Sequence, residues 1–212
     1  GGAASRLVVP AARVTRVDEA LGERAILLAL AATAHHALAA PHARPPELIV
    51  GHGVLGRLLA RVSMALGGPS PTVWECNPAR MGGATGYDVR TAASDGRRNY
   101  RAAYDASGDA SLLDELIDRL SHGGEVILAG FYIEPLSSNF TQAFMREAHI
   151  RVAAEWKDTD MAAVTELCAS GRLSLDDLIT HRQTPQQADA AYRQAFGDPD
   201  CLKMVIDWRS AA

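Results

Sequence analysis

The sequence contains few cysteines, and no two of them form a C-x-x-C pair. Cys76, Cys168 and Cys201 are odd in number and widely separated along the 212 residues. This spacing argues against a disulfide framework and suits a reducing compartment, so we expect a cytoplasmic protein. The cysteines and the mostly unclustered histidines give no zinc tetrad, and we expect no metal site.

Two further features are missing: an excess of positive charge and a long apolar run. The formal net charge is −4, which offers no attraction for nucleic acid. Arg, Glu, His or Pro interrupts each apolar run before the roughly 18 residues that a membrane span needs. The first residues, "GGAASRLVVPAARV", lack the order of a signal peptide and do not begin with Met. We expect no nucleic-acid partner and no transmembrane segment, and interpret the chain as a fragment or a processed product.

What the sequence does contain is an alternation of short apolar runs with helical stretches. The runs "ELIV" (47–50), "TVWE" (72–75) and "EVIL" (125–128) are predicted strands, and the stretches between such runs have helical spacing. This order predicts an α/β fold with a doubly wound parallel sheet of the Rossmann type. A long helix is predicted over 19–40, and two helices and a strand over 160–208.

A glycine pattern follows the first of these strands. Gly51, Gly53 and Gly56 have G-x-G-x-x-G spacing and open the helix "VLGRLLARV". In this context the motif predicts a dinucleotide-binding turn, in which Gly53 leaves room for a pyrophosphate. The N–H groups around Val54 and Leu55 would point at the phosphates. A tight turn without a ligand is the alternative, and His52 is expected to act only through its backbone.

An acidic residue ends the next predicted strand. Glu75 follows Gly56 by 19 positions, where dinucleotide-binding folds place a ribose ligand. Its carboxylate could accept hydrogen bonds from both ribose hydroxyls and would repel a 2′-phosphate, so NAD is favoured over NADP. Arg80 weakens this preference because it could meet a phosphate. The strand-end turns at 105–108 and 128–132 are expected to border the same cofactor.

These stretches resemble the medium-chain dehydrogenase/reductase superfamily, on the strings "ATAHHAL", "LIVGHGVLG", "VWECNPAR" and "CLKMVIDW". The longer strings "LALAATAHHAL" and "AFMREAHIRVAAEW" resemble, more narrowly, dehydrogenases that act on 3-hydroxyethyl bacteriochlorophyllide a in bacteriochlorophyll biosynthesis. That resemblance implies an NAD-dependent oxidation of the 1-hydroxyethyl group of a chlorophyllide-type tetrapyrrole to an acetyl group.

The resemblance also implies a set of cofactor contacts. They are Gly51, Gly53, Val54, Leu55 and Gly56 for the pyrophosphate, Glu75 for the ribose, Asn77 and Arg80 beside the adenosine, Ser107, Gly108, Gly130 and Phe131 towards the nicotinamide, Thr33 against the nicotinamide, and Lys203 reaching the pyrophosphate.

Members of the superfamily begin with a GroES-like domain, and only its end resembles part of this chain. The implied organisation is the end of the catalytic domain with a connecting helix (1–40), an NAD-binding domain (41–160), and C-terminal helices with a return strand (161–212). We expect such a chain to bind NAD and to turn over slowly or undetectably by itself. A homo-oligomer is compatible with this organisation.

Two adjacent histidines are candidate proton acceptors. His35 and His36 lie about 100° apart on a helix, so at most one can face the nicotinamide. We take His36, with Thr33, as the catalytic candidate, and a capped or solvated histidine on a packed helix is the alternative. Two other functions stay open: another medium-chain alcohol dehydrogenase or quinone reductase, and a dinucleotide-binding module without chemistry.

Overall fold

A computed structural model of the chain describes residue 4 and residues 6–211. The chain divides into two compact units: a sheet unit, Leu28–Ser174, and a second unit formed by Gly1–Leu27 and Leu175–Ala212. Residues 1–3, 5 and 212, which fall in the predicted segments 1–40 and 161–212, lie outside the described residues. The predicted boundaries at residues 40 and 160 differ from these unit boundaries. They separate the end of a catalytic domain, an NAD-binding domain and a C-terminal segment, and this division stays a prediction.

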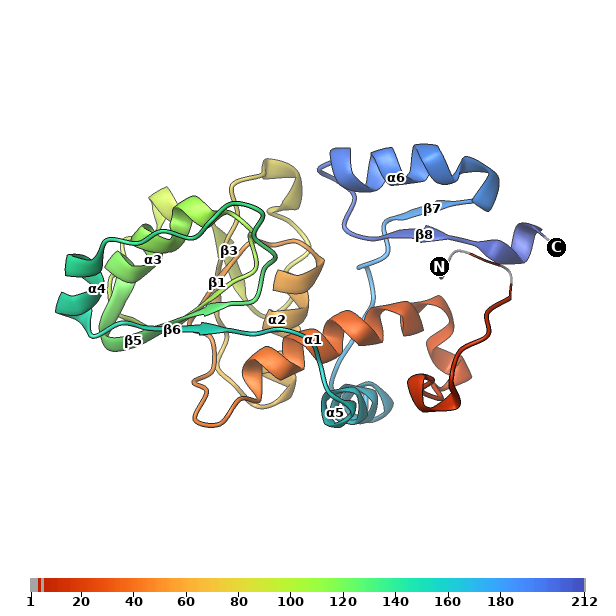
Figure 1. Cartoon of the computed structure of the whole chain (residues 1–212), viewed down its shortest axis with the longest axis horizontal. Coiled ribbons are helices and arrows are strands. Elements are labelled where there is room, and N and C mark those ends of the chain that lie inside the picture. Colours follow the sequence, from red (N-terminus) through yellow and green to blue (C-terminus); the bar gives the residue numbers. More distant parts are fainter. Residues whose placement is uncertain (1–3, 5, 212) are drawn as a thin grey trace. The chain divides into compact units, whose positions relative to one another are not determined.

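The sheet unit is built on six parallel strands in the order β3-β2-β1-β4-β5-β6 (Figure 1). The strands are β1 (Leu48–Val50), β2 (Thr72–Trp74), β3 (Asp88–Arg90), β4 (Tyr100–Asp105), β5 (Leu120–Leu128) and β6 (His149–Val152). The chain runs outwards from β1 to β3, returns to the centre, and runs outwards again from β4 to β6. This is the doubly wound order, so the predicted fold class is confirmed.

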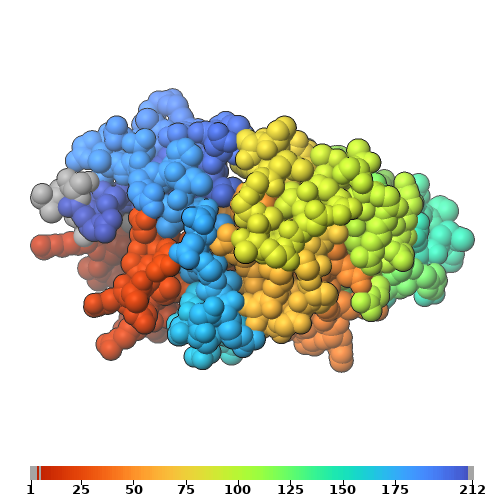
Figure 2. All heavy atoms as spheres, turned by 180° about the vertical axis from the view of Figure 1, so that it is seen from behind, coloured from red at the N-terminus to blue at the C-terminus, as the bar shows by residue number. Residues whose placement is uncertain are grey.

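Helices cover both faces of this sheet. They are α1 (Leu28–Leu38), α2 (Val54–Ala65), α3 (Leu113–Arg119), α4 (Phe140–Arg146) and α5 (Asp158–Ala169). Helix α1 packs against α2 and α5, while α3 packs against α4 and β5, and the two groups lie on either side of the sheet in Figure 1. Helix α4 forms the outer end of the unit (teal in Figure 2).

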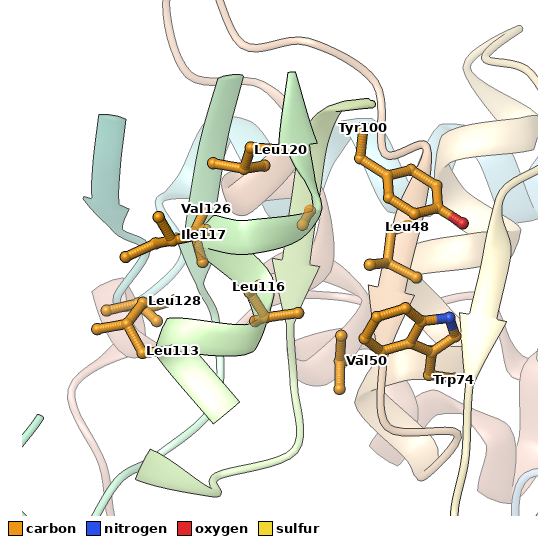
Figure 3. Close-up of a cluster of buried hydrophobic side chains, with 11 residues drawn as sticks. Leu48, Val50, Trp74, Tyr100, Leu113, Leu116, Ile117, Leu120, Val126 and Leu128 are labelled. Carbon is orange, nitrogen blue, oxygen red and sulfur yellow. The ribbon is translucent and has the colours of Figure 1, made fainter. Parts of the chain in front are cut away.

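The core of the sheet unit lies between α3 and the central strands. Figure 3 shows Leu116 and Ile117 of α3 beside the side chains of β1 and β5, with Trp74 next to Val50. Burying each such side chain contributes roughly 2 kcal/mol. A buried carboxylate, Asp95, joins this core to the polar loop before β4, because it accepts hydrogen bonds from Trp74 Nε1 (2.7 Å) and from the Tyr100 hydroxyl.

The second unit contains a small parallel sheet. Its elements are β7 (His181–Gln183), α6 (Ala188–Gly197) and β8 (Met204–Ile206), and β7 pairs with β8. The sequence pattern predicted α6 and β8 but not β7, whose three residues are too polar for an apolar run. Within residue 4 and residues 6–211, no helix is both long and apolar enough to cross a membrane.

One predicted helix is wrong in its first half. Residues Glu19–Leu27 form 3₁₀ turns, and the α-helix begins only at Leu28. The cause is Gly22, whose φ of 53° and ψ of −133° are incompatible with a continuous helix.

Candidate cofactor pocket

Three turns meet at the carboxyl ends of β1, β4 and β5. Gly51 has a φ of 91°, and a Cβ built on it would lie 3.2 Å from the Ser107 Cα. A Cβ on Gly56 would lie 1.8 Å from the Gly51 carbonyl oxygen, so α2 can approach the turn only with glycine there. Gly51 and Gly56 therefore allow a tight turn before a closely packed helix, and the predicted binding of a dinucleotide there stays a prediction.

The turns after β4 and β5 are joined through Asp105. Its backbone carbonyl accepts hydrogen bonds from the Ala129 and Gly130 amides, both at 2.8 Å. Its carboxylate accepts the Ser107 amide (2.8 Å) and the Ser107 hydroxyl (2.6 Å), and burial raises the pKa of this carboxyl group. A Cβ on Gly130 would lie 2.9 Å from the Gly108 amide nitrogen. Asp105 thus holds together the turns that carry Ser107, Gly108 and Gly130.

A pocket of about 560 Å³ opens at the carboxyl ends of β1, β2 and β4. Six of the predicted cofactor residues line it: Gly51, Gly53, Glu75, Asn77, Arg80 and Ser107. Val54, Leu55 and Gly56 form the first turn of α2, directly after Gly53. Gly108, Gly130 and the exposed Phe131 belong to the adjoining turns and are not part of the lining. Trp74, Cys76 and Ala92 complete one wall.

Glu75 is buried at the end of β2 and is already well supplied with hydrogen-bond donors. Its Oε2 accepts the His52 amide at 2.8 Å, and its Oε1 accepts the Cys76 and Asn77 amides at 2.9 and 2.8 Å. A carboxylate has about four lone-pair positions, so little capacity is left for a ligand. Glu75 therefore links the turn after β1 to the loop after β2, and its predicted bonds to both ribose hydroxyls stay a prediction.

The side chain of His52 has a role that the sequence analysis missed. It is fully buried, with Nδ1 2.6 Å from the Arg80 carbonyl oxygen and Nε2 2.8 Å from the Tyr87 hydroxyl. The expectation that His52 acts only through its backbone is wrong. A histidine inside an otherwise apolar and glycine-rich turn was the signal available in the sequence.

The two adjacent histidines of α1 share one partner. His35 Nδ1 lies 2.7 Å from Asp160 Oδ1, and His36 Nδ1 lies 2.9 Å from Asp160 Oδ2. Burial acts to raise the pKa of Asp160, but the Lys157 amide and the two imidazoles together bring it below its usual value. Neither histidine lines the pocket, nor does Thr33, whose hydroxyl donates to the Ala29 carbonyl at 3.0 Å.

The remaining candidates lie outside the pocket lining. Lys203 belongs to the second unit, where its carbonyl accepts the Thr180 and His181 amides, and its predicted contact with the pyrophosphate stays a prediction. In the part of the chain that the structure describes, no three His, Cys, Asp or Glu side chains lie close enough together to hold a metal ion.

Comparison with known proteins decides the family. The chain is 56% identical over 211 residues to the 2-desacetyl-2-hydroxyethyl bacteriochlorophyllide A dehydrogenase of Rhodobacter capsulatus, covering 100% of this chain and 67% of that protein. It is 55% identical over 212 residues to the enzyme of the same name from Cereibacter sphaeroides, again with 67% of that protein covered. The chain belongs to this family of dehydrogenases. The resemblance stated from the sequence is confirmed.

Solved structures support the same fold. A short chain alcohol dehydrogenase from Escherichia coli CFT073 in complex with NADH superposes with a TM-score of 0.78 over 93% of this chain and 63% of its own, at 21% identity. A dehydrogenase from Sinorhizobium meliloti 1021 bound to NADP gives 0.79 over 97% and 64%, at 16% identity. No family profile matches the chain. This chain therefore shares the fold of these two dehydrogenases over more than nine-tenths of its length.

Proposed function

We propose that this bacteriochlorophyllide dehydrogenase homologue binds NAD in the pocket at the ends of β1, β2 and β4. We further propose that it serves the oxidation of the 3-(1-hydroxyethyl) group of a bacteriochlorophyllide precursor to 3-acetyl. The observation that carries the proposal is the 56% identity over the whole chain to the Rhodobacter capsulatus dehydrogenase. The glycine turn supports it independently, because its geometry fits a dinucleotide.

The residues of the turn fit a pyrophosphate. A Cβ built on Gly53 would meet only Arg80 Nη1, at 3.9 Å, so the fold itself leaves this position open. The first amides of α2, at Val54 and Leu55, have no intrahelical acceptor, and the helix dipole adds positive potential there. The Arg80 guanidinium beside Gly53 adds a cation. Bound NAD would supply a nicotinamide ring that accepts a hydride.

The β4 and β5 turns would hold the other half of the cofactor. Ser107 lines the pocket, and Asp105 fixes it through two hydrogen bonds. Gly108 and Gly130 lie so close that a Cβ on Gly130 would be 2.9 Å from the Gly108 amide nitrogen, so no side chain separates these two turns. A flat ring could therefore approach these turns closely, and we propose Ser107, Gly108, Gly130 and Phe131 as its surroundings.

The test of this function uses a chimera. The chain replaces the 211 aligned residues of the Rhodobacter capsulatus relative, and the purified protein is mixed with NAD and 3-(1-hydroxyethyl)bacteriochlorophyllide a. We expect NADH fluorescence to rise together with a red shift of the pigment absorption, because the new carbonyl group conjugates with the macrocycle. The unaltered relative serves as the positive control.

The same assay separates the alternatives. A chimera that leaves the pigment unchanged but reduces simple aldehydes or quinones would support a different medium-chain dehydrogenase. A chimera that binds NADH and transfers hydride to none of these substrates would support a binding module without chemistry.

His36 is our proposed proton acceptor, oriented by Asp160. A carboxylate that holds one imidazole nitrogen leaves the other as the base, as in catalytic histidine–aspartate pairs. His36→Asn keeps an amide donor near Nδ1 but removes Nε2, so we expect kcat in the pigment assay to fall about 100-fold with unchanged NADH affinity. His35→Asn is the matched control, because it contacts the same carboxylate. Full activity in the His36→Asn protein would remove this residue from the mechanism.

We also propose a homo-oligomer. Strand β6 is an edge strand of the sheet, and Ile150 and Val152 on it are 45% and 73% exposed. Exposed apolar edge strands favour pairing with another chain. Light scattering of the purified chain tests this proposal, and a monomer at all concentrations would contradict it.

A further inference from the structure

The loop after β2 carries the residues expected beside the adenosine, yet it has little regular structure of its own. Between Glu75 and the start of β3 at Asp88 it contains one short 3₁₀ turn, Pro78–Arg80. Asn77 caps that turn by accepting the Ala79 amide at 3.0 Å. Something outside the loop must therefore fix the position of Arg80.

The buried imidazole of His52 supplies one such anchor. Its hydrogen bonds determine which of the two ring nitrogens carries the proton. The Arg80 carbonyl can only accept, so His52 Nδ1 carries the hydrogen in the 2.6 Å contact. Burial, together with the nearby Arg57 guanidinium, lowers the pKa of His52 and favours the neutral ring. In the neutral ring Nε2 accepts, and the Tyr87 hydroxyl donates to it over 2.8 Å. These hydrogen bonds therefore run in one direction, from the Tyr87 hydroxyl to His52 and from His52 to the Arg80 carbonyl.

A buried guanidinium supplies the second anchor. Arg57 is 5% exposed on α2, and its Nε donates to the His52 carbonyl at 3.0 Å. Its Nη2 donates to the Arg80 carbonyl (3.2 Å) and to the Gly82 carbonyl (2.8 Å). The Arg80 carbonyl thus receives two donors, and both come from the glycine turn and its helix.

We propose that His52, Arg57 and Tyr87 are positioning residues for the adenosine half of the cofactor. They fasten the Arg80 loop to the glycine turn, so that Asn77 and the Arg80 guanidinium stand in place before a ligand enters. Binding then does not have to order this loop, which is the usual gain from a preorganised site. The inference rests on the proposed cofactor function. It adds to the site two buried residues that do not line the pocket, His52 and Arg57, together with Tyr87.

The test compares four variants by calorimetric titration with NADH and with ADP-ribose, which lacks the nicotinamide. Tyr87→Phe removes the donor to Nε2 together with the hydroxyl that accepts from the Arg61 side chain, and His52→Leu removes both bonds of the imidazole. We expect each to raise the Kd of both ligands by about three- to tenfold, because a buried bond is lost and the loop is released. His52→Asn keeps a donor near Nδ1 and should restore most of the affinity.

Tyr104→Phe is the matched control. It removes a tyrosine hydroxyl that donates to the Arg44 carbonyl at 2.8 Å, and neither residue lines the pocket. We expect its Kd values to equal those of the wild type. Equal losses in Tyr104→Phe and Tyr87→Phe would mean general loosening of the fold and would overturn the inference.

Two other outcomes also overturn it, and they are distinguishable from failure of the proposed function. If the folded Tyr87→Phe protein binds NADH and ADP-ribose as the wild type does, these residues do not position the site. If only NADH weakens, the effect lies outside the adenosine half. If the wild-type chain binds neither ligand, the proposed function fails and the inference fails with it.

Discussion

A Gly53→Val chain should fold normally and lose NADH binding by about 100-fold or more, equivalent to about 3 kcal/mol. Gly53 has a φ of −72° and a ψ of −171°, which any residue can adopt. A Cβ there has open space, with Arg80 Nη1 as the nearest atom at 3.9 Å. The branched side chain would instead fill the place that we assign to the pyrophosphate. Circular dichroism and NADH fluorescence measure the two effects separately.

Two further glycine variants make this result specific. Gly96→Val places the same side chain at another position where a Cβ meets no atom within 4 Å, and it should bind NADH normally. Gly56→Ala should lose stability as well as binding, because its Cβ would lie 1.8 Å from the Gly51 carbonyl oxygen. Wild-type affinity in a folded Gly53→Val protein would mean that the cofactor lies elsewhere.

The parts of the fold that the sequence predicted correctly depend on neighbours along the chain. The alternation of apolar runs and helical stretches is enough to predict a doubly wound sheet. The glycine turn is likewise local, since Gly51, Gly53 and Gly56 act within six residues between β1 and α2. The break at Gly22 was missed because a single glycine in an alanine-rich stretch only weakens the prediction of a helix.

The contacts that the sequence analysis missed join positions far apart along the chain. His35 and Asp160 are separated by 125 positions, and the sequence around either residue does not predict a contact with the other. The adjacent histidines suggested that only one could act, because they point in different directions from the helix. In the structure both imidazoles have a hydrogen-bond partner, because each lies against a different oxygen of the Asp160 carboxylate.

Contacts in the pocket wall were hidden from the sequence as well, although they join residues closer together along the chain. The place of Glu75 at the end of a predicted strand, 19 positions after Gly56, predicts that its carboxylate lies beside the glycine turn. They do not reveal that three backbone amides already donate to it, because these bonds depend on how the loop after β2 folds back. The roles of His52 and Tyr87 depend on that same loop and were equally hidden.

The same three bonds lead to an expected preference for NADH over NADPH of at least about tenfold in Kd, which is about 1.4 kcal/mol. Glu75 is 8% exposed and held in place by the His52, Cys76 and Asn77 amides. Its negative charge therefore cannot swing away from a 2′-phosphate that enters the pocket. Repulsion at a buried charge is screened less by salt than repulsion at the surface, so the preference should persist at physiological ionic strength.

Glu75→Gln tests the cause of this preference, with calorimetric titration of both cofactors. The variant loses the charge and keeps the size, so the two Kd values should approach each other within about threefold, chiefly through tighter NADPH binding to nearby Arg80. Glu125→Gln is the matched control, because Glu125 also accepts a backbone amide, from Arg44 at 3.2 Å, and does not line the pocket. Equal affinities in the wild type would remove the ribose role from Glu75. A strong preference that survives in Glu75→Gln would assign the discrimination to the shape of the pocket instead of its charge.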